Sequence, residues 1–163
     1  MKKKDLDFNQ TLQIKLDSLR TAKKIVLSTC SNNRVTSRVV DCACHDKTIY
    51  FLTWSHHTKC TQIKENPNVA LCYENLQIEG VAEIKGNPLL ETNKAHSNKY
   101  REKQPEIYDE YVKYNGMVIV KVDIGSIHSW EGRQDGGSGY FLDIVDISKK
   151  IAFKLNAEDQ KMY

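Results

Sequence analysis

The sequence predicts a mainly β protein, in which a mostly antiparallel sheet closes into a barrel with helices at its edges. Apolar runs rich in β-branched and aromatic residues recur along the chain, separated by turn-forming Asn, Asp, Gly and Pro. The strand-like runs are grouped early and late, and the loops between them are too short for repeated β-α-β crossovers. With 163 residues, 40% hydrophobic and 28% charged, we expect one globular domain spanning residues 1–163.

The chain is predicted to begin with a helical segment, residues 1–22. Apolar residues between Leu6 and Leu19 recur at spacings near three and four, which predicts an amphipathic helix from Leu6 to Arg20. The lysines at positions 2–4 are expected to be a solvated tail.

Residues 23–86 are predicted to form barrel strands with one short helix. Asn32-Asn33 and Asp46-Lys47 provide turns between β-branched runs, and Asn66-Pro67 ends the helix because proline disfavours helical backbone in the residue before it. The expected strands are Lys24–Cys30, Arg34–Cys44, Thr48–Thr53, Val69–Glu74 and Leu76–Lys85, and the expected helix is Thr58–Glu65.

The remainder of the chain is predicted to hold a helical segment, residues 88–114, and closing strands, residues 117–155. Helix-like, charge-rich stretches precede a long extended run, and a glycine-rich loop over residues 131–139 separates that run from the last strands. The expected helices are Leu89–Arg101 and Pro105–Tyr114, and the expected strands are Met117–Trp130, Tyr140–Asp146 and Ile151–Leu155.

Composition disfavours several classes of function. The net charge of +3 is mild and acidic residues alternate with basic ones, so we expect no nucleic-acid partner. No stretch approaches the roughly 20 apolar residues that span a bilayer, and we expect a cytoplasmic protein without a membrane partner. The five cysteines are interpreted as reduced thiols. Cys42 and Cys44 could contribute to a metal site with His45, but two alternate residues of one strand also explain the spacing, and we predict no metal.

One stretch places candidate anion-binding groups close together in sequence. Arg38 lies within a predicted strand, Leu52-Thr53 end another, and the polar segment Ser55 to Lys59 opens the short helix. A helix N-terminus presents free N–H groups, so a phosphate could lie there between Lys59 and Arg38. Taken singly, each residue is better explained as a surface charge or a helix cap.

The order of these residues resembles the pyridoxamine 5'-phosphate oxidase-like family, in particular its general stress protein type. That family has an R-x-V strand, an aromatic-rich strand ending in T, an S-x-x-x-K segment, N-P-x-V-A-L and a strand with V-E-G. The matching segments here are Arg38-Val39-Val40, Tyr50-Phe51-Leu52-Thr53, Ser55 to Lys59, Asn66 to Leu71, and Ile78-Glu79-Gly80. The resemblance covers residues 22–86 well and implies a split β-barrel of the FMN-binding type.

The resemblance also implies FMN at a homodimer interface, with residues from both subunits. Arg38 and Lys59 would pair with the phosphate, and Thr58 would donate a hydroxyl to it. The backbone of Val39 to Asp41 and of Leu52-Thr53 would face the flavin ring. From the partner subunit, Asn75, Gln77 and Trp130 would reach the cofactor, although a core tryptophan explains Trp130 equally well. The implied cofactor-binding residues are Arg38, Val39, Val40, Asp41, Leu52, Thr53, Thr58, Lys59, Asn75, Gln77 and Trp130.

Departures from the family pattern limit the expected activity. Thr58 replaces an arginine that often stands beside the phosphate lysine, which removes one cation. The segment after Trp130 lacks the histidine that, with an arginine, holds the pyridoxal substrate, so we do not expect true pyridoxamine 5'-phosphate oxidase activity. We expect an FMN-dependent oxidoreductase acting on a small molecule, with NADH or NADPH as a candidate electron donor and no identified catalytic residue.

Several alternatives stay open at this point. The chain could be a non-catalytic flavin-binding or stress-related protein, a haem- or deazaflavin-binding relative, or a nitroimidazole reductase-like enzyme. His56 and His57 are interpreted as loop residues that shape the pocket, but they would also serve as acid, base or haem ligand. Gly136 to Gly139 is interpreted as a turn, with an anion cradle as the alternative.

Overall fold

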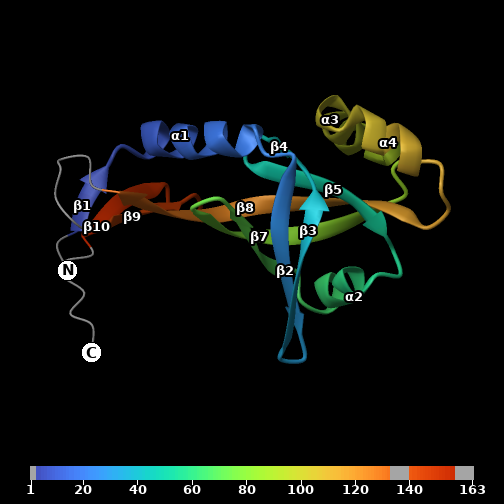
Figure 1. Cartoon of the computed structure of the whole chain (residues 1–163), viewed down its shortest axis with the longest axis horizontal. Coiled ribbons are helices and arrows are strands. Elements are labelled where there is room, and N and C mark those ends of the chain that lie inside the picture. Colours follow the sequence, from blue (N-terminus) through green and yellow to red (C-terminus); the bar gives the residue numbers. More distant parts are fainter. Residues whose placement is uncertain (1–2, 133–139, 157–163) are drawn as a thin grey trace.

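The structure is a computed structural model that describes residues 3–132 and 140–156. A single antiparallel sheet dominates it, with the path β1-β10-β9-β8-β7-β6-β2-β3 and with β4 and β5 off that path (Figure 1). The strands are β1 (Lys3–Leu6), β2 (Lys24–Ser31), β3 (Arg34–Asp41), β4 (Ala43–His45), β5 (Thr48–Trp54), β6 (Asn68–Tyr73), β7 (Leu76–Gly86), β8 (Met117–Gly132), β9 (Tyr140–Asp146) and β10 (Ile151–Asn156).

The helices lie at the periphery of this sheet, as Figure 1 shows. The first packs its buried stripe, which includes Leu12, Leu16 and Leu19, against β4, β9 and β10. This stripe follows from the three- and four-residue spacing of its leucines. The helices are α1 (Phe8–Arg20), α2 (Thr58–Glu65), the short 3-10 helix η1 (Glu91–Asn93), α3 (Lys94–Lys103) and α4 (Pro105–Tyr111).

The long strand β8 divides the sheet into two parts. Its residues Met117–Asp123 pair with β5 and its residues Ser126–Gly132 pair with β9, while β7 runs along the other side. The change of partner coincides with a bulge at Gly125. A Cβ at Gly80, opposite this bulge, would lie 2.7 Å from the Asp123 carbonyl oxygen, which explains the glycine.

The barrel is open along one seam. Strand β3 pairs with β2, whereas β5 pairs with β4 and β8, so β3 and β5 come into contact without a hydrogen-bonded ladder. The fold is therefore a split barrel with peripheral helices, as the sequence predicts. Helix α2 follows β5 and lies beside the β2–β3 hairpin (Figure 1).

Most predicted element types and many boundaries are confirmed. Helix α2 and strand β9 have the predicted limits, Thr58–Glu65 and Tyr140–Asp146. The hairpin turn between β2 and β3 places Asn32 and Asn33 at φ of 47° and 59°, the left-handed backbone that Asn tolerates best among residues with a side chain. The division of the chain into one domain stays a prediction.

Three predicted elements were wrong in detail. The first helix begins at Phe8, because the Asp7 side chain accepts a hydrogen bond from the Gln10 N–H at 2.7 Å and caps it. Residues 3–6 instead form β1 and pair with β10, so this part of the lysine-rich start is not a free tail. The run predicted as one strand, Arg34–Cys44, is interrupted at Cys42, whose N–H bonds the Lys23 carbonyl.

The helical and closing segments differ from prediction at their ends. The predicted helix Leu89–Arg101 is η1 followed by α3, and α4 ends at Tyr111. Strand β8 extends to Gly132, two residues into the predicted loop. The anion-cradle alternative at Gly136 to Gly139 falls outside the described residues. None of the helices in the described part of the chain is long and apolar enough to cross a membrane.

Candidate functional site

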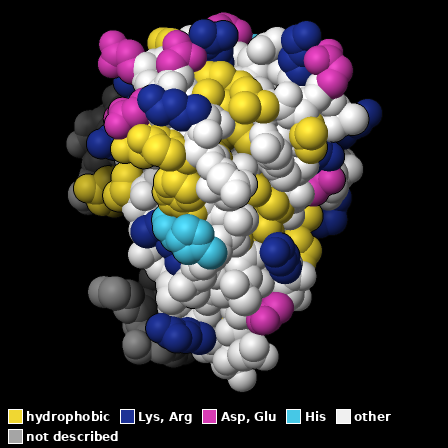
Figure 2. Space-filling view, turned by 90° about the vertical axis from the view of Figure 1, so that its right-hand side faces the viewer, with side chains coloured by type: hydrophobic (Ala, Val, Ile, Leu, Met, Phe, Trp, Pro, Cys, Tyr) yellow, Lys and Arg dark blue, Asp and Glu magenta, His cyan; other side chains and the backbone are white. Residues whose placement is uncertain are grey.

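A cavity of about 220 Å³ lies at the open seam of the barrel. Strands β3 and β5 form two of its walls, and α3 and α4 contribute aromatic and aliphatic side chains from above. Figure 2 views this end of the molecule and shows hydrophobic side chains gathered beside histidine and basic side chains. The lining residues are Val39, Val40, Asp41, Leu52, Thr53, Trp54, His57, Lys59, Tyr100, Ile107, Tyr111 and Met117.

Aromatic rings form a row beside this cavity. Trp54 lies 5.9 Å from the His56 ring and 5.7 Å from the Tyr114 ring, measured between centroids. Tyr114 is in turn 6.2 Å from Tyr111, and His56 is 5.0 Å from His57. Tyr111 and Tyr114 are 37% and 46% exposed, so two rings of this row face solvent. The arrangement offers flat surfaces suited to stacking with a planar ligand.

A second cavity, of about 340 Å³, adjoins the first and is cationic. It shares His57 and Lys59 with the first cavity, so the two form one continuous candidate site. Its positive side chains, Arg34, Arg38 and Lys59, form no ion pair with any described carboxylate. The lining residues are Arg34, Thr36, Arg38, His57, Thr58 and Lys59.

The N-terminus of α2 opens into this cationic cavity. His57 is the N-cap residue and its side chain makes no capping hydrogen bond, so first-turn N–H groups stay available to a ligand. These N–H groups and the dipole of the helix favour an anion at the same place as the cations. The cavity thus combines backbone donors with uncompensated positive charge.

Lys59 is held at the junction of the two cavities. Its Nζ lies 3.0 Å from Thr53 Oγ1 and 3.1 Å from His57 Nδ1. Burial lowers the pKa of Lys59, and so does the positive charge of Arg38, whereas Cys60 raises it. Burial, Lys59 and His56 lower the pKa of His57, which keeps this imidazole neutral at pH 7. A neutral His57 can accept a hydrogen bond from the Lys59 ammonium through Nδ1.

Within the described part of the chain, the acceptors that hold Arg38 are all neutral. Its NH1 donates to Thr29 Oγ1 at 2.7 Å and to the Leu27 carbonyl at 3.2 Å, and its NH2 donates to Thr36 Oγ1. Partial burial lowers the pKa of Arg38, but a guanidinium stays charged at neutral pH. The guanidinium is therefore fixed in place while its charge remains available to an anion.

The structure brings most of the predicted site residues together. The seam cavity is lined by Val39, Val40, Asp41, Leu52, Thr53 and Lys59, and the cationic cavity by Arg38, Thr58 and Lys59. The predicted roles of these residues toward a cofactor stay predictions, because no ligand is present.

Three predicted residues lie elsewhere in the same chain. Asn75 Nδ2 donates to the Trp130 carbonyl at 2.8 Å, and Gln77 pairs with His128, so this group forms its own cluster at the far end of β7 and β8. Met117 in the seam cavity and Trp130 are near opposite ends of β8, up to roughly 40 Å apart at about 3.3 Å per residue. Within one chain, this cluster and the seam cavity therefore lie toward opposite ends of β8. The Trp130 side chain is 47% exposed, so it is not a core tryptophan within this chain.

Sequence reasoning missed several lining residues. Arg34 lies four positions before Arg38 on β3, and side chains at even spacing share one face of a strand, so the alternation already contained this signal. Arg34 supplies a third cation to the cavity that Thr58 also lines. Tyr100, Ile107 and Tyr111 come from distant helices, and no local pattern indicates their place in the site.

Cys42 and Cys44 are both buried. Burial raises the pKa of the Cys42 thiol to about 12 and that of the Cys44 thiol to about 11, so both thiols are protonated at neutral pH. No group of three or more His, Cys, Asp and Glu residues suited to a metal ion occurs among residues 3–132 and 140–156.

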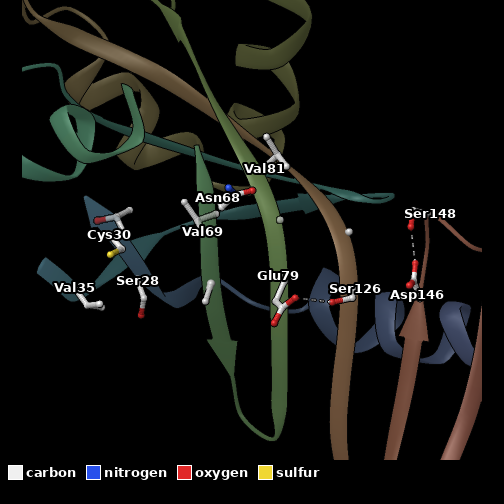
Figure 3. Close-up of a pocket in the computed structure, with 14 residues that line it drawn as sticks. Ser28, Cys30, Val35, Asn68, Val69, Glu79, Val81, Ser126, Asp146 and Ser148 are labelled. Atoms are coloured by element: carbon white, nitrogen blue, oxygen red, sulfur yellow. Dashed lines mark hydrogen bonds between the residues drawn. The ribbon is translucent and has the colours of Figure 1, made fainter. Parts of the chain in front are cut away.

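A larger hollow, of about 650 Å³, lies on the open face of the sheet. Its lining comes from β2, β3, β6, β7, β8, β9 and the β9–β10 turn. Figure 3 shows these side chains, among them Ser28, Val35, Val81 and Ser126. Val35, on the edge strand β3, and Val81, on β7 between two paired strands, are 64% and 52% exposed. Its lining contains no Lys, Arg or His, so this hollow lacks the charge of the seam site.

Comparison with known proteins gives the following similarities. The family model described as pyridoxamine 5'-phosphate oxidase matches residues 15–131. No curated protein matches the chain.

Solved structures share the fold at low identity. General stress protein 26 from Bacillus anthracis is 22% identical, with 72% of this chain and 92% of that chain covered and a TM-score of 0.56. A FAD-binding protein from Mesorhizobium loti is 14% identical, with 78% and 96% covered and a TM-score of 0.57. The haem storage protein HutZ from Vibrio cholerae is 15% identical, with 69% and 87% covered and a TM-score of 0.57.

Proposed function

Because this chain belongs to the pyridoxamine 5'-phosphate oxidase family, we propose that it binds FMN in the seam site and acts as a flavin-dependent oxidoreductase on a small molecule. The observation that carries this proposal is the continuity of the two cavities: cations without a described acidic partner, Arg34, Arg38 and Lys59, adjoin a seam lined by apolar and aromatic side chains. A molecule with a terminal phosphate and a planar ring matches both halves.

The cationic half suits a phosphate monoester. Such a phosphate carries between one and two negative charges near neutrality and offers three strong acceptor oxygens. Arg38 and Lys59 would pair with it, Arg34 would add a third charge, and Thr58 would donate from its hydroxyl and from the helix N-terminus. The lowered pKa values of Lys59 and Arg38 reflect positive charge that a bound anion would stabilise.

The seam half would hold only part of the flavin ring. Its volume of about 220 Å³ is below the roughly 300–1,000 Å³ of ligand pockets in general. Strands β3 and β5 present Val39 to Asp41 and Leu52-Thr53 as the faces the ring would contact. Further walls are needed, and a second copy of the chain would provide them.

A homodimer would bring together predicted cofactor-binding residues that lie apart within one chain. Asn75, Gln77 and Trp130 cluster toward the end of β8 away from the seam of their own chain, and in a dimer they would reach the seam of the partner subunit. The exposed Val35 and Val81 around the hollow in Figure 3 supply an apolar surface that association would bury. We therefore propose two equivalent sites per dimer.

Bound FMN would supply the redox chemistry by accepting and passing on electrons. The chain's own residues hold the phosphate, cover the ring and exclude water. The exposed rings of Tyr111 and Tyr114 border the seam and suit a planar second substrate, such as the nicotinamide of NADH or NADPH. A neutral His57 at the junction is placed to accept a hydrogen bond.

The first experiment is the visible absorption spectrum of the purified chain, followed by release of the bound molecule and its identification by mass. Flavin bands with released FMN support the proposal, and oxidation of NADH or NADPH over many turnovers then separates an enzyme from a non-catalytic flavin protein. An intense haem band would instead favour the alternative in which His56 or His57 is a ligand. A chain that is colourless and does not bind added FMN would refute the proposal.

The remaining alternatives have their own readouts. A deazaflavin would be recognised by its different released mass. Nitroimidazole reduction would appear as loss of the nitro-group absorbance in the presence of the reduced flavin form, and its absence would leave a nicotinamide-dependent activity as the proposal.

A further inference from the structure

We propose that Gln62 is a positioning residue that sets the Arg38 guanidinium for its anion and ties it to helix α2. This inference rests on the proposed function, because it concerns the phosphate half of the same site. Gln62 lies on α2, three residues after Lys59, and is 3% exposed. It lines neither cavity, so any effect on an anion must act through other residues.

The hydrogen bonds of Gln62 fix the orientation of its amide. Its Nε2 donates to the Arg34 carbonyl at 2.8 Å. Its Oε1 accepts from Thr29 Oγ1 and from Thr36 Oγ1, each at 2.6 Å. A carbonyl oxygen cannot donate, so only one orientation of the amide satisfies the Arg34 carbonyl and both hydroxyls.

The two threonine hydroxyls then transmit this orientation to Arg38. Each hydroxyl has one proton, and that proton is donated to Gln62. The lone pairs of each hydroxyl are left to accept, one from Arg38 NH1 and the other from Arg38 NH2. Because a guanidinium can only donate, the two hydroxyls accept from Arg38 and donate to Gln62, and the amide holds these two acceptors in place on the adjacent strands β2 and β3.

An amide side chain can orient the two hydroxyls without neutralising the positive charge of Arg38. A glutamate at position 62 could not donate to the Arg34 carbonyl, and its negative charge, close to Arg38, would compete with a bound anion. An apolar side chain would leave the two hydroxyls free to rotate. Gln62 thus fixes the separation between a strand cation, Arg38, and a helix cation, Lys59, before the anion arrives.

The test compares Gln62→Met, which keeps the length of the side chain, and Gln62→Glu with Ile63→Ala as a control. Ile63 is a neighbouring buried residue of α2 without a hydrogen bond to Arg38, so its truncation loosens the packing of the helix alone. The readout is the ratio of the dissociation constants of riboflavin and FMN, measured by flavin fluorescence titration, with thermal unfolding as a check of the fold.

We expect Gln62→Met to lower the preference for FMN by about tenfold, Gln62→Glu to lower it further, and Ile63→Ala to leave the ratio unchanged. A lower melting temperature with an unchanged ratio in Gln62→Met would show that Gln62 is structural only. If neither Gln62 variant folds, Thr36→Val breaks the same relay from the strand side and should lower the ratio as well, and an unchanged ratio there would overturn the inference.

A measurement without flavin separates this inference from the proposed function. In ¹⁵N NMR of the ligand-free protein, the Arg38 NH1 and NH2 groups should give separate signals, because restrained rotation prevents their averaging, and Gln62→Met should average them. Averaged signals already in the wild type would refute the positioning role. A wild type that does not bind FMN but shows separate Arg38 signals would refute the proposed function alone.

Discussion

The substitution Lys59→Met tests the phosphate site most directly. Lys59 Nζ lies between Thr53 Oγ1 and His57 Nδ1 and forms no ion pair with a described carboxylate, so its charge is available to a ligand of the candidate site. A full charge pair at 4 Å interacts by about 4 kcal/mol at an effective dielectric of about 20. Competition with water reduces this to about 1.5–3 kcal/mol for a hydrogen bond to a charged group. We expect FMN to bind roughly 10- to 150-fold more weakly, given a tenfold change per 1.4 kcal/mol.

The assay is titration of the ligand-free protein with FMN and with riboflavin, followed by flavin fluorescence. Riboflavin lacks the phosphate, so its affinity should change by less than about threefold. Lys64→Met, an exposed lysine in the last turn of the same helix, is the matched control and should leave both affinities unchanged. Equal losses for FMN and riboflavin, or an unchanged FMN affinity, would remove Lys59 from the phosphate site.

Three further predictions follow from the same geometry. Arg34→Met should weaken FMN by about 1 kcal/mol or more without affecting riboflavin, because Arg34 supplies the third cation of the cavity; equal titration curves for variant and wild type would show that it does not contact the phosphate. Gly80→Ala should destabilise the fold by about 1–3 kcal/mol in chemical unfolding, since the new Cβ would lie 2.7 Å from the Asp123 carbonyl oxygen and 2.8 Å from Val122 Cγ1; unchanged stability would mean that β8 shifts freely there. Burial, Lys59 and His56 lower the pKa of His57 below its unfolded value near 6.5, so between the two values the unfolded chain binds a proton that the folded chain does not. The ligand-free protein should therefore lose stability as the pH falls through about 6.5, and the His57→Gln variant should lose less stability over the same pH range. Identical profiles of unfolding free energy against pH for the two proteins would contradict the lowered pKa.

Local patterns in the sequence account for most of the secondary structure. The limits of α2 and β9 match their predictions, because Pro67 and the turn residues around these elements act on their immediate neighbours. The predicted first helix starts two residues too early, because Leu6 continues the helical spacing of its leucines. The helix begins at Phe8 because Asp7 caps it and because β1 pairs with β10, a strand almost 150 positions later.

The residues of the candidate site also fall into two groups: those that local sequence patterns indicate and those that only the fold brings together. Arg38 and Lys59 could be selected from the sequence, since a strand cation and a cation in the first turn of a helix are recognised by their local context. Gln62 could not, because a buried glutamine on a helix has no distinctive pattern until its partners from two strands are known. The same holds for Tyr100, which a separate helix brings to the seam.

By itself, the sequence determined most of the strands, the short helix, the two main cations and a family resemblance that the match over residues 15–131 bears out. Alternation, turn residues and proline effects act over a few positions, so they can be read without the fold. Only the tertiary structure decided that β8 exchanges β5 for β9 and that a seam opens between β3 and β5. It also decided that Trp130 lies far from the seam of its own chain, because hydrogen-bonded pairing between distant strands sets which side chains share a cavity.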